Sequence, residues 1–421
     1  MIGFRETAIH WSKYFELTKD RTTKVWLLSD EPSSVMSSTK DFNVGSTAIS
    51  IIDHFNGRLP YLLNYKFLVK HEQINIKFIP TIILDSNLIN LLKGYINSPN
   101  TTNEQSRCTY QFLKFVVERN FDYNLVFYFL ESAVMNGIEK AINNGNAAAA
   151  TILQLHTMNE KIFLQDGSII PDRKRVKEYA KRYGINSIDS NFFNDIATLM
   201  AKEMLKDVDE QFIDNLRYII NYTYAALLKL VLINTSNKQN IANKLQEFCD
   251  FFECQLNLVL GRELAIATYY LSNKLQSKFI PFEIKQIPFA TVRARLCHTA
   301  RDFFLLRVPE ISLSSGNEQK TLLCFVCSAE KAIRQIGRLI TIESLVSSPK
   351  LAIPSGISFN QEELQQKLSE DAFDVLCKQQ QQQVAARLIA STVEKREPIS
   401  KEQLKDLITN LEDQIKTLCK Q

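Results

Sequence analysis

The sequence has 421 residues, of which 45% are hydrophobic and 23% are charged, and its formal net charge is +4. This composition is ordinary for a folded globular protein and excludes collagen-like and disordered chains. The net charge is too small to predict nucleic-acid binding by itself. The length predicts two or three domains, or one large domain with insertions.

The location of the protein is predicted from what the chain lacks. Residues 1–13 do not show the basic and then apolar pattern of a secretory signal, and no run reaches the roughly 18 apolar residues of a membrane span. The cysteines are scattered, which favours reduced thiols over a disulfide framework. Cys324 and Cys327 lie in an apolar strand pattern without partners for zinc. We expect a cytoplasmic protein that does not bind membranes.

Residues 1–77 predict a small mixed lead-in unit. Apolar patterns at Val25–Leu28 and Tyr65–Val69 predict strands on either side of a stretch rich in Ser, Asp and Gly, from Ser29 to Ser46. This part of the chain contains no motif that predicts chemistry.

A strand that ends in a carboxylate follows this unit. Residues 79–84 form an apolar run, which is typical of a buried strand in a parallel sheet because such strands are covered on both faces. Asp85, Ser86 and Asn87 come next, and a helical pattern begins near Leu88. An Asp at the carboxyl end of such a strand faces the crevice where open α/β sheets bind ligands. It is equally suited to cap the helix that follows.

A second strand repeats this arrangement far along the chain. Residues 321–326 are apolar, and Ser328 and Glu330 follow them before another helical pattern. If the two strands are neighbours in one parallel sheet, Asp85 and Glu330 lie at adjacent carboxyl ends.

Three further acids interrupt apolar helical patterns. The pattern over 105–139 contains Glu131, with Asp122 as the expected cap between two helices, and the pattern over 290–308 contains Asp302. Glu263 is a similar acid, although the neighbouring Arg262 can neutralise it. A carboxylate among apolar side chains is costly unless it is paired or bound to a metal. These acids are therefore candidates for chemistry.

The remaining sequence is predicted to be mainly helical. Residues 145–260 are predicted to form a helical insertion. It carries a basic stretch at 171–177, which we interpret as the solvated face of a helix. Residues 379–383 are a polyglutamine tract, interpreted as a solvated helix surface. Ser400 and Gln403 are spaced as a capping box. The last helix has a heptad seam, expected to pack within the chain or on a partner: Leu404, Ile408, Leu411, Ile415 and Leu418.

Clustered carboxylates favour a divalent metal. Several carboxylates at one place repel each other and hold protons unless a cation neutralises them. Oxygen ligands suit Mg²⁺ or Mn²⁺ better than zinc. Such an ion can activate water and stabilise the charge that develops on a phosphodiester.

The order of these motifs resembles the PIN-domain superfamily of metal-dependent ribonucleases. The resemblance covers about 78–140 and 290–345, and it implies a Rossmann-like parallel sheet flanked by helices, with Mg²⁺ or Mn²⁺ and RNA as the substrate. It implies supporting roles for Ser86, Asn87 and Ser328. It implies that the catalytic and metal-binding acids are Asp85, Glu131, Asp302 and Glu330, with Glu263 as a competing choice for the second acid.

The sequence thus predicts an α/β protein with a PIN-like domain over 78–346. A helical insertion at about 145–289 interrupts this domain, and a helical extension over 347–421 follows it. The expected activity is that of an endoribonuclease rather than a deoxyribonuclease, and by analogy it would serve as a toxin or a phage-defence effector. The alternative is a PIN-like scaffold without activity that binds RNA or a protein partner, or associates with itself, through its helical parts. A helical-repeat adaptor is disfavoured because no fixed repeat period occurs.

Overall fold

The computed structural model describes residues 4–32, 39–99, 102–189, 191–236, 240–258, 261–272, 275, 279–316, 319–342, 344–348, short stretches between 358 and 378, and 398–420. The chain forms two compact units. The first consists of Met1–Leu216 and Arg307–Arg334, and the second of Arg217–Leu306 and Gln335–Gln421. The polyglutamine tract at 379–383 lies outside the described residues.

The first unit has a mixed α/β fold. The boundary predicted at residue 77 falls inside this unit, and so does the first half of the predicted insertion. Its elements in chain order are α1 Phe4–Thr18, β1 Lys24–Pro32, β2 Lys40–Val44, β3 Thr47–Ile52, β4 Arg58–Leu63, α2 Tyr65–Leu68, β5 Lys77–Leu84, α3 Ser86–Asn97, α4 Glu104–Glu118, β6 Asp122–Asn124, α5 Val126–Asn136, α6 Ile138–Thr157, α7 Glu160–Asp166, α8 Arg173–Tyr183, α9 Phe192–Leu205, α14 Val308–Ser315, β7 Lys320–Ser328 and the start of α15 Lys331–Gly337.

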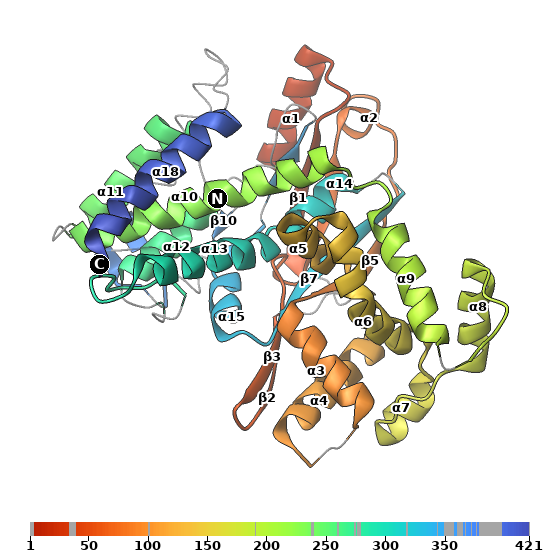
Figure 1. The fold of residues 1–421 in the computed structure, drawn as a ribbon. Helices are drawn as coiled ribbons and strands as arrows, with labels where there is room; N and C mark the ends of the chain where they lie inside the picture. The colour runs from red at the N-terminus through yellow and green to blue at the C-terminus, as the bar shows by residue number, and fades with distance from the viewer. Residues whose placement is uncertain are drawn as a thin grey trace. The chain divides into compact units, whose positions relative to one another are not determined.

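Within the described residues, five strands of this unit form one sheet in the order β2-β3-β7-β5-β6 (Figure 1). β7, β5 and β6 are parallel, whereas β2 pairs antiparallel with β3, and β3 pairs antiparallel with β7. The sheet is therefore mixed, not wholly parallel as predicted. The reason is the two-residue turn at Gly45 and Ser46, because so short a connection can join only antiparallel strands. Gly45 has a φ of +57°, a value that glycine adopts without steric strain.

The predicted strands at 79–84 and 321–326 are confirmed as β5 and β7, which pair over eight residues from Lys77–Lys320 to Leu84–Cys327. The helix expected after Asp85 is confirmed as α3. The strand predicted at 65–69 is wrong, because Asn64 caps a short helix there by accepting a hydrogen bond from Phe67 N at 2.9 Å. Asp122 does not cap a helix, since it begins β6 beside β5.

An aromatic cluster packs one face of the sheet against α4. Phe42 of β2 contacts Phe112 and Phe115 of α4, with ring centroids 5.8 and 5.6 Å apart. Phe325 of β7 points to the same face and stacks on Phe121, with centroids 5.3 Å apart and planes inclined by 4°. Residues that alternate with these along the strands point to the opposite face. That face carries the polar residues described below.

The second unit is mainly helical among its described residues. Its elements are the end of α10 Glu210–Ser236, α11 Ile241–Phe251, a π-helical turn at Phe252–Leu256, α12 Gly261–Leu271, α13 Phe289–Leu305, β8 Ile340–Thr341, β9 Ser344–Ser347, β10 Ser358–Phe359 and α18 Lys401–Leu418. The predicted capping box of Ser400 and Gln403 is confirmed. Glu412 of α18 accepts hydrogen bonds from Tyr224 at 2.6 Å and Arg293 at 3.0 Å, so the last helix packs within the chain.

One helix in the described part of the chain is long and apolar enough to cross a membrane by length and composition. It spans Glu210–Thr235, and 72% of its most apolar window is buried inside the protein. Such burial is typical of a core helix of a soluble protein, which passes the same test of length and composition. The eight cysteines are all described and are free thiols.

Candidate functional site

The ends of β5 and β7 bring two predicted site residues together. The strands are parallel and in register, so Asp85 follows β5 exactly where Ser328 ends β7. The backbone confirms this alignment, because Asp85 N donates to Cys327 O at 3.1 Å. The adjacent carboxyl ends expected from the sequence are therefore present in the sheet.

Asp85 is buried, with 6% of its surface exposed, and its carboxylate is held at both oxygens. Oδ1 accepts a hydrogen bond from Leu88 N at 2.5 Å, which is the N-cap interaction of α3. Oδ2 accepts a hydrogen bond from the hydroxyl of Ser328. The capping interpretation of Asp85 is thus confirmed, and the two hydrogen bonds fix the carboxylate at the carboxyl end of β5.

Glu330 lies beside this carboxylate. Its backbone N–H donates to Ser328 Oγ at 2.9 Å, so one hydroxyl links the two acidic residues. Burial, the main cause, and the charge of Glu330 together raise the pKa of Asp85 to about 6, against the lowering effect of the hydrogen bonds from Ser328, Leu88 and Ala329. Burial also raises the pKa of the half-buried Glu330. The pair therefore holds more protons near neutral pH than two separate carboxyl groups would.

A row of polar side chains continues from Asp85 across the sheet. The strand register places Asp41 of β2 opposite Ser50 of β3, and Ser50 opposite Ser328 of β7. Ser50 and Ser328 are fully buried, and Ser50 donates a hydrogen bond to the exposed Asp41. Sequence analysis missed Asp41 and Ser50. The signal was the Gly45-Ser46 turn, because a two-residue hairpin turn sets these two residues opposite each other.

A second buried aspartate, Asp53, was also missed. It follows β3, is 7% exposed, and accepts hydrogen bonds from Phe55 N at 2.7 Å and Gly57 N at 2.6 Å. Burial raises its pKa to about 7, although these bonds and the charge of Arg58 lower it. Because β3 runs antiparallel to β7, the end of β3 points away from the edge that carries Asp85.

The other predicted site residues lie on α3 and α5 of the first unit and on α12 and α13 of the second unit. Ser86 and Asn87 are exposed in the first turn of α3, and Glu131 is half-buried on α5, which packs against β5. Asp302 is half-buried on α13 of the second unit. Glu263, in the same unit, is buried and accepts a hydrogen bond from Thr223 Oγ1 at 2.7 Å. Over the residues that the structure describes, no group of three or more His, Cys, Asp or Glu side chains is placed to hold a metal ion.

Comparison of the chain with protein-family models, with curated proteins and with solved structures found no match. The site therefore rests on its own geometry: two acidic residues with raised pKa values at the carboxyl ends of two parallel strands, with the buried Ser328 bonded to the carboxylate of Asp85 and to the backbone N–H of Glu330.

Proposed function

We propose that the first unit is a metal-dependent endoribonuclease of PIN type, with Asp85 and Glu330 at its centre. The observation that carries the proposal is the pairing of β5 with β7, which brings these two acids together from positions far apart in the sequence. The part of the motif order that lies in the first unit, with Asp85, Glu131, Ser328 and Glu330, supports RNA as the substrate through its resemblance to PIN ribonucleases. The proposal is confined to the first unit.

The electrostatics of the pair favour a cation. Burial destabilises the ionised forms of Asp85 and Glu330 and raises the pKa of both, and repulsion by the charge of Glu330 adds to this effect at Asp85. A divalent cation would relieve this repulsion and keep both groups ionised. The donor atoms are carboxylate and hydroxyl oxygens, and this set suits Mg²⁺ or Mn²⁺.

The residues fit such an ion. An ionised carboxylate has four lone-pair positions in all, and Asp85 accepts hydrogen bonds from Leu88 N, from Ser328 Oγ and from the backbone of Ala329, which leaves one position for a metal. Ser328 orients the Asp85 carboxylate through its hydroxyl and positions Glu330 through the backbone N–H of that residue. Hydrogen bonds to the residues that bind a metal set the orientation of these residues and tune the affinity of the site.

The reaction would be hydrolysis of an RNA phosphodiester. A bound ion would supply Lewis-acid activation of water and neutralise charge on the phosphate. Asp85 and Glu330 would hold the ion, and their ionised forms are the ones that bind it. With a pKa of about 6, Asp85 is mostly ionised at neutral pH, so the site is competent to bind metal under those conditions.

The test compares two buried aspartates that share a local structure. We expect the full-length protein to cleave single-stranded RNA with Mn²⁺ and to be inactive with a chelator. Asp85→Asn should lower the cleavage rate by about 100-fold or more, since even an outer-shell residue of a metal site is worth about 10–100-fold. Asp53→Asn is the matched control, because Asp53 is equally buried and hydrogen-bonded but has no acidic partner identified beside it. Equal activity of the wild type and Asp85→Asn would refute the proposal.

One observation favours a second function, that of an RNA-binding scaffold without nuclease activity. α8 exposes Arg173, Lys177 and Lys181 at spacings of four residues, so these cations share one face of the helix. The hydrogen bonds of Asp85 also suffice for a purely structural cap. Calorimetric titration with Mn²⁺ separates the two functions, because a scaffold would bind RNA but would show no saturable metal uptake.

A further inference from the structure

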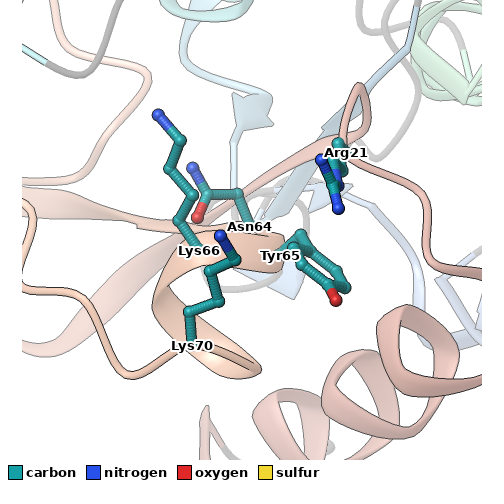
Figure 2. A pocket seen from close by; sticks show the side chains of 5 residues that line it. All are labelled: Arg21, Asn64, Tyr65, Lys66 and Lys70. Carbon is teal, nitrogen blue, oxygen red and sulfur yellow. The ribbon is translucent and has the colours of Figure 1, made fainter.

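A small cationic pocket lies in the first unit, between the turn that precedes β1 and the short helix α2 (Figure 2). Its lining residues are Arg21, Asn64, Tyr65, Lys66 and Lys70, and its volume is about 100 Å³. Three of the five carry positive charge, and no acidic residue lines the pocket. In Figure 2 the Arg21 side chain lies on one side and the two lysines on the other, with Asn64 and Tyr65 between them.

The turn that carries Arg21 is fixed by the neighbouring Asp20. Asp20 Oδ1 accepts hydrogen bonds from Thr22 N and Thr22 Oγ1, both at 2.8 Å, and Oδ2 accepts one from Thr23 Oγ1 at 2.7 Å. Burial alone would raise the pKa of Asp20, but these hydrogen bonds hold it well below its usual value. Asp20 is therefore ionised and its oxygens are bound within the turn. Arg21 projects from a backbone that is already ordered.

The position of the Arg21 side chain is set by Tyr65. The guanidinium carbon lies 5.5 Å from the centre of the Tyr65 ring, within the range of a cation–π contact. This contact joins two segments that are more than forty residues apart in the sequence. It holds the guanidinium at the rim of the pocket without consuming its charge.

The lysines project from α2 and the turn that follows it. Asn64, which is 5% exposed, caps α2 by accepting a hydrogen bond from Phe67 N at 2.9 Å. Lys66 and Lys70 are four residues apart and exposed. Lys70 Nζ lies 3.9 Å from Glu72 Oε1. Because both side chains are about half exposed, this ion pair is weak.

We propose that this pocket binds a phosphate monoester group. A pocket of this volume accommodates a phosphate group. A monoester phosphate near neutral pH carries up to two negative charges and several strong acceptor oxygens. Guanidinium groups suit phosphate geometry, and lysines add point charge without a fixed direction. Asn64, whose side chain is buried, supplies a neutral polar group to the lining.

The decisive experiment is a calorimetric titration of the full-length protein with inorganic phosphate at low ionic strength, because salt screens exposed charges. We expect saturable binding that weakens at least tenfold in the double variant Lys66→Gln/Lys70→Gln. Lys93→Gln removes an exposed lysine of α3 and serves as the control, which should bind as the wild type does. Circular dichroism confirms that each variant is folded. Unsaturable binding, or equal affinity in the double variant, overturns the proposal.

Two RNA oligonucleotides of one sequence identify the source of the phosphate. If the pocket receives the end of a chain, the oligonucleotide with a 5′-phosphate binds more tightly than the one with a 5′-hydroxyl, and the difference disappears in the double variant. If the pocket receives a free phosphate compound, the two oligonucleotides bind equally while inorganic phosphate still binds in a lysine-dependent way. This inference does not rest on the nuclease proposal, because binding at the pocket is measured without metal or cleavage.

Removal of the competing acid should have the opposite effect. Glu72→Gln frees Lys70 from its weak ion pair and takes a negative charge away from the pocket. Phosphate affinity should rise about twofold to threefold, in keeping with an exposed pair. A fall in affinity would contradict a site that selects its ligand by charge.

Discussion

Asp85 and Asp53 offer a comparison between two places in the same sheet. Each follows an apolar strand, each is nearly buried, and each accepts hydrogen bonds from backbone N–H groups of the following residues. Their neighbours differ, because Asp53 lies near the positive Arg58 and Asp85 lies near the negative Glu330. The local structure of an aspartate therefore does not decide which charge lies beside it. The neighbouring strands decide this.

The strand directions explain this difference. β5 is parallel to β7, so the residues after both strands meet at one edge. β3 is antiparallel to β7, so Asp53 is turned away from that edge. A pair of parallel strands therefore places polar groups from distant parts of the chain at one edge of the sheet.

The largest expected effect comes from removing a central aromatic side chain of the sheet that both aspartates follow. Phe325 is fully buried and contacts both Phe121 and Phe55. Phe325→Ala should lower the free energy of unfolding by about 3–5 kcal/mol, measured by urea denaturation. Phe67→Ala is the control, since Phe67 is 41% exposed and its loss should cost less than about 1 kcal/mol. A similar cost for the two variants would show that the aromatic cluster does not support the sheet.

The next effect concerns the dependence of stability on pH. Asp53 and Asp85 have raised pKa values of about 7 and about 6. Their contribution to stability is fully present below the unfolded pKa of about 3.9 and is lost as the pH rises through the folded values. Asp53→Asn should remove a decline on the order of 4 kcal/mol between about pH 4 and 7, and Asp85→Asn a smaller decline that is complete near pH 6. Denaturation at several pH values measures both slopes, and unchanged slopes would contradict the raised pKa values.

We expect Ser328, which lies between the two acids, to affect metal affinity more than the free energy of unfolding. Ser328→Ala removes the hydroxyl that orients Asp85, and Mn²⁺ affinity should fall by about 10–100-fold. Ser50→Ala is a matched control, because Ser50 is equally buried and also bonds an aspartate, Asp41. Each change should lower the free energy of unfolding by about 1 kcal/mol. If both variants bind Mn²⁺ equally well, Ser328 has no part in a metal site.

The smallest expected effect is the pH dependence of metal uptake. Because a carboxyl group must lose its proton to bind a metal, Mn²⁺ affinity should be about tenfold weaker at about pH 5 than at about pH 7.5. The raised pKa of Glu330 acts in the same direction. Asp53→Asn should show the same pH profile as the wild type, as measured by calorimetry. A profile that is flat over this range would exclude Asp85 as a ligand.

Much of the first unit was predictable from local patterns. The apolar run before Asp85 predicted β5, and the similar run before Ser328 predicted β7, because strands covered on both faces lack alternation. In the second unit, the capping box at Ser400 was equally predictable, since it depends on residues three positions apart. Prediction failed at Tyr65–Val69, where the apolar residues suit a strand but the cap at Asn64 starts a helix. Short apolar runs do not distinguish strand from helix.

The sequence by itself determined that β5 and β7 are strands, that a helix follows Asp85, and which acids interrupt apolar segments. Those properties depend on neighbours within a few residues of each other along the chain. Only the tertiary structure decided that β2 and β3 join the sheet, that Ser328 bonds Asp85, and that Arg21 meets Tyr65. These contacts depend on strand order and direction, which local patterns do not encode because residues brought together by the fold are distant in the chain.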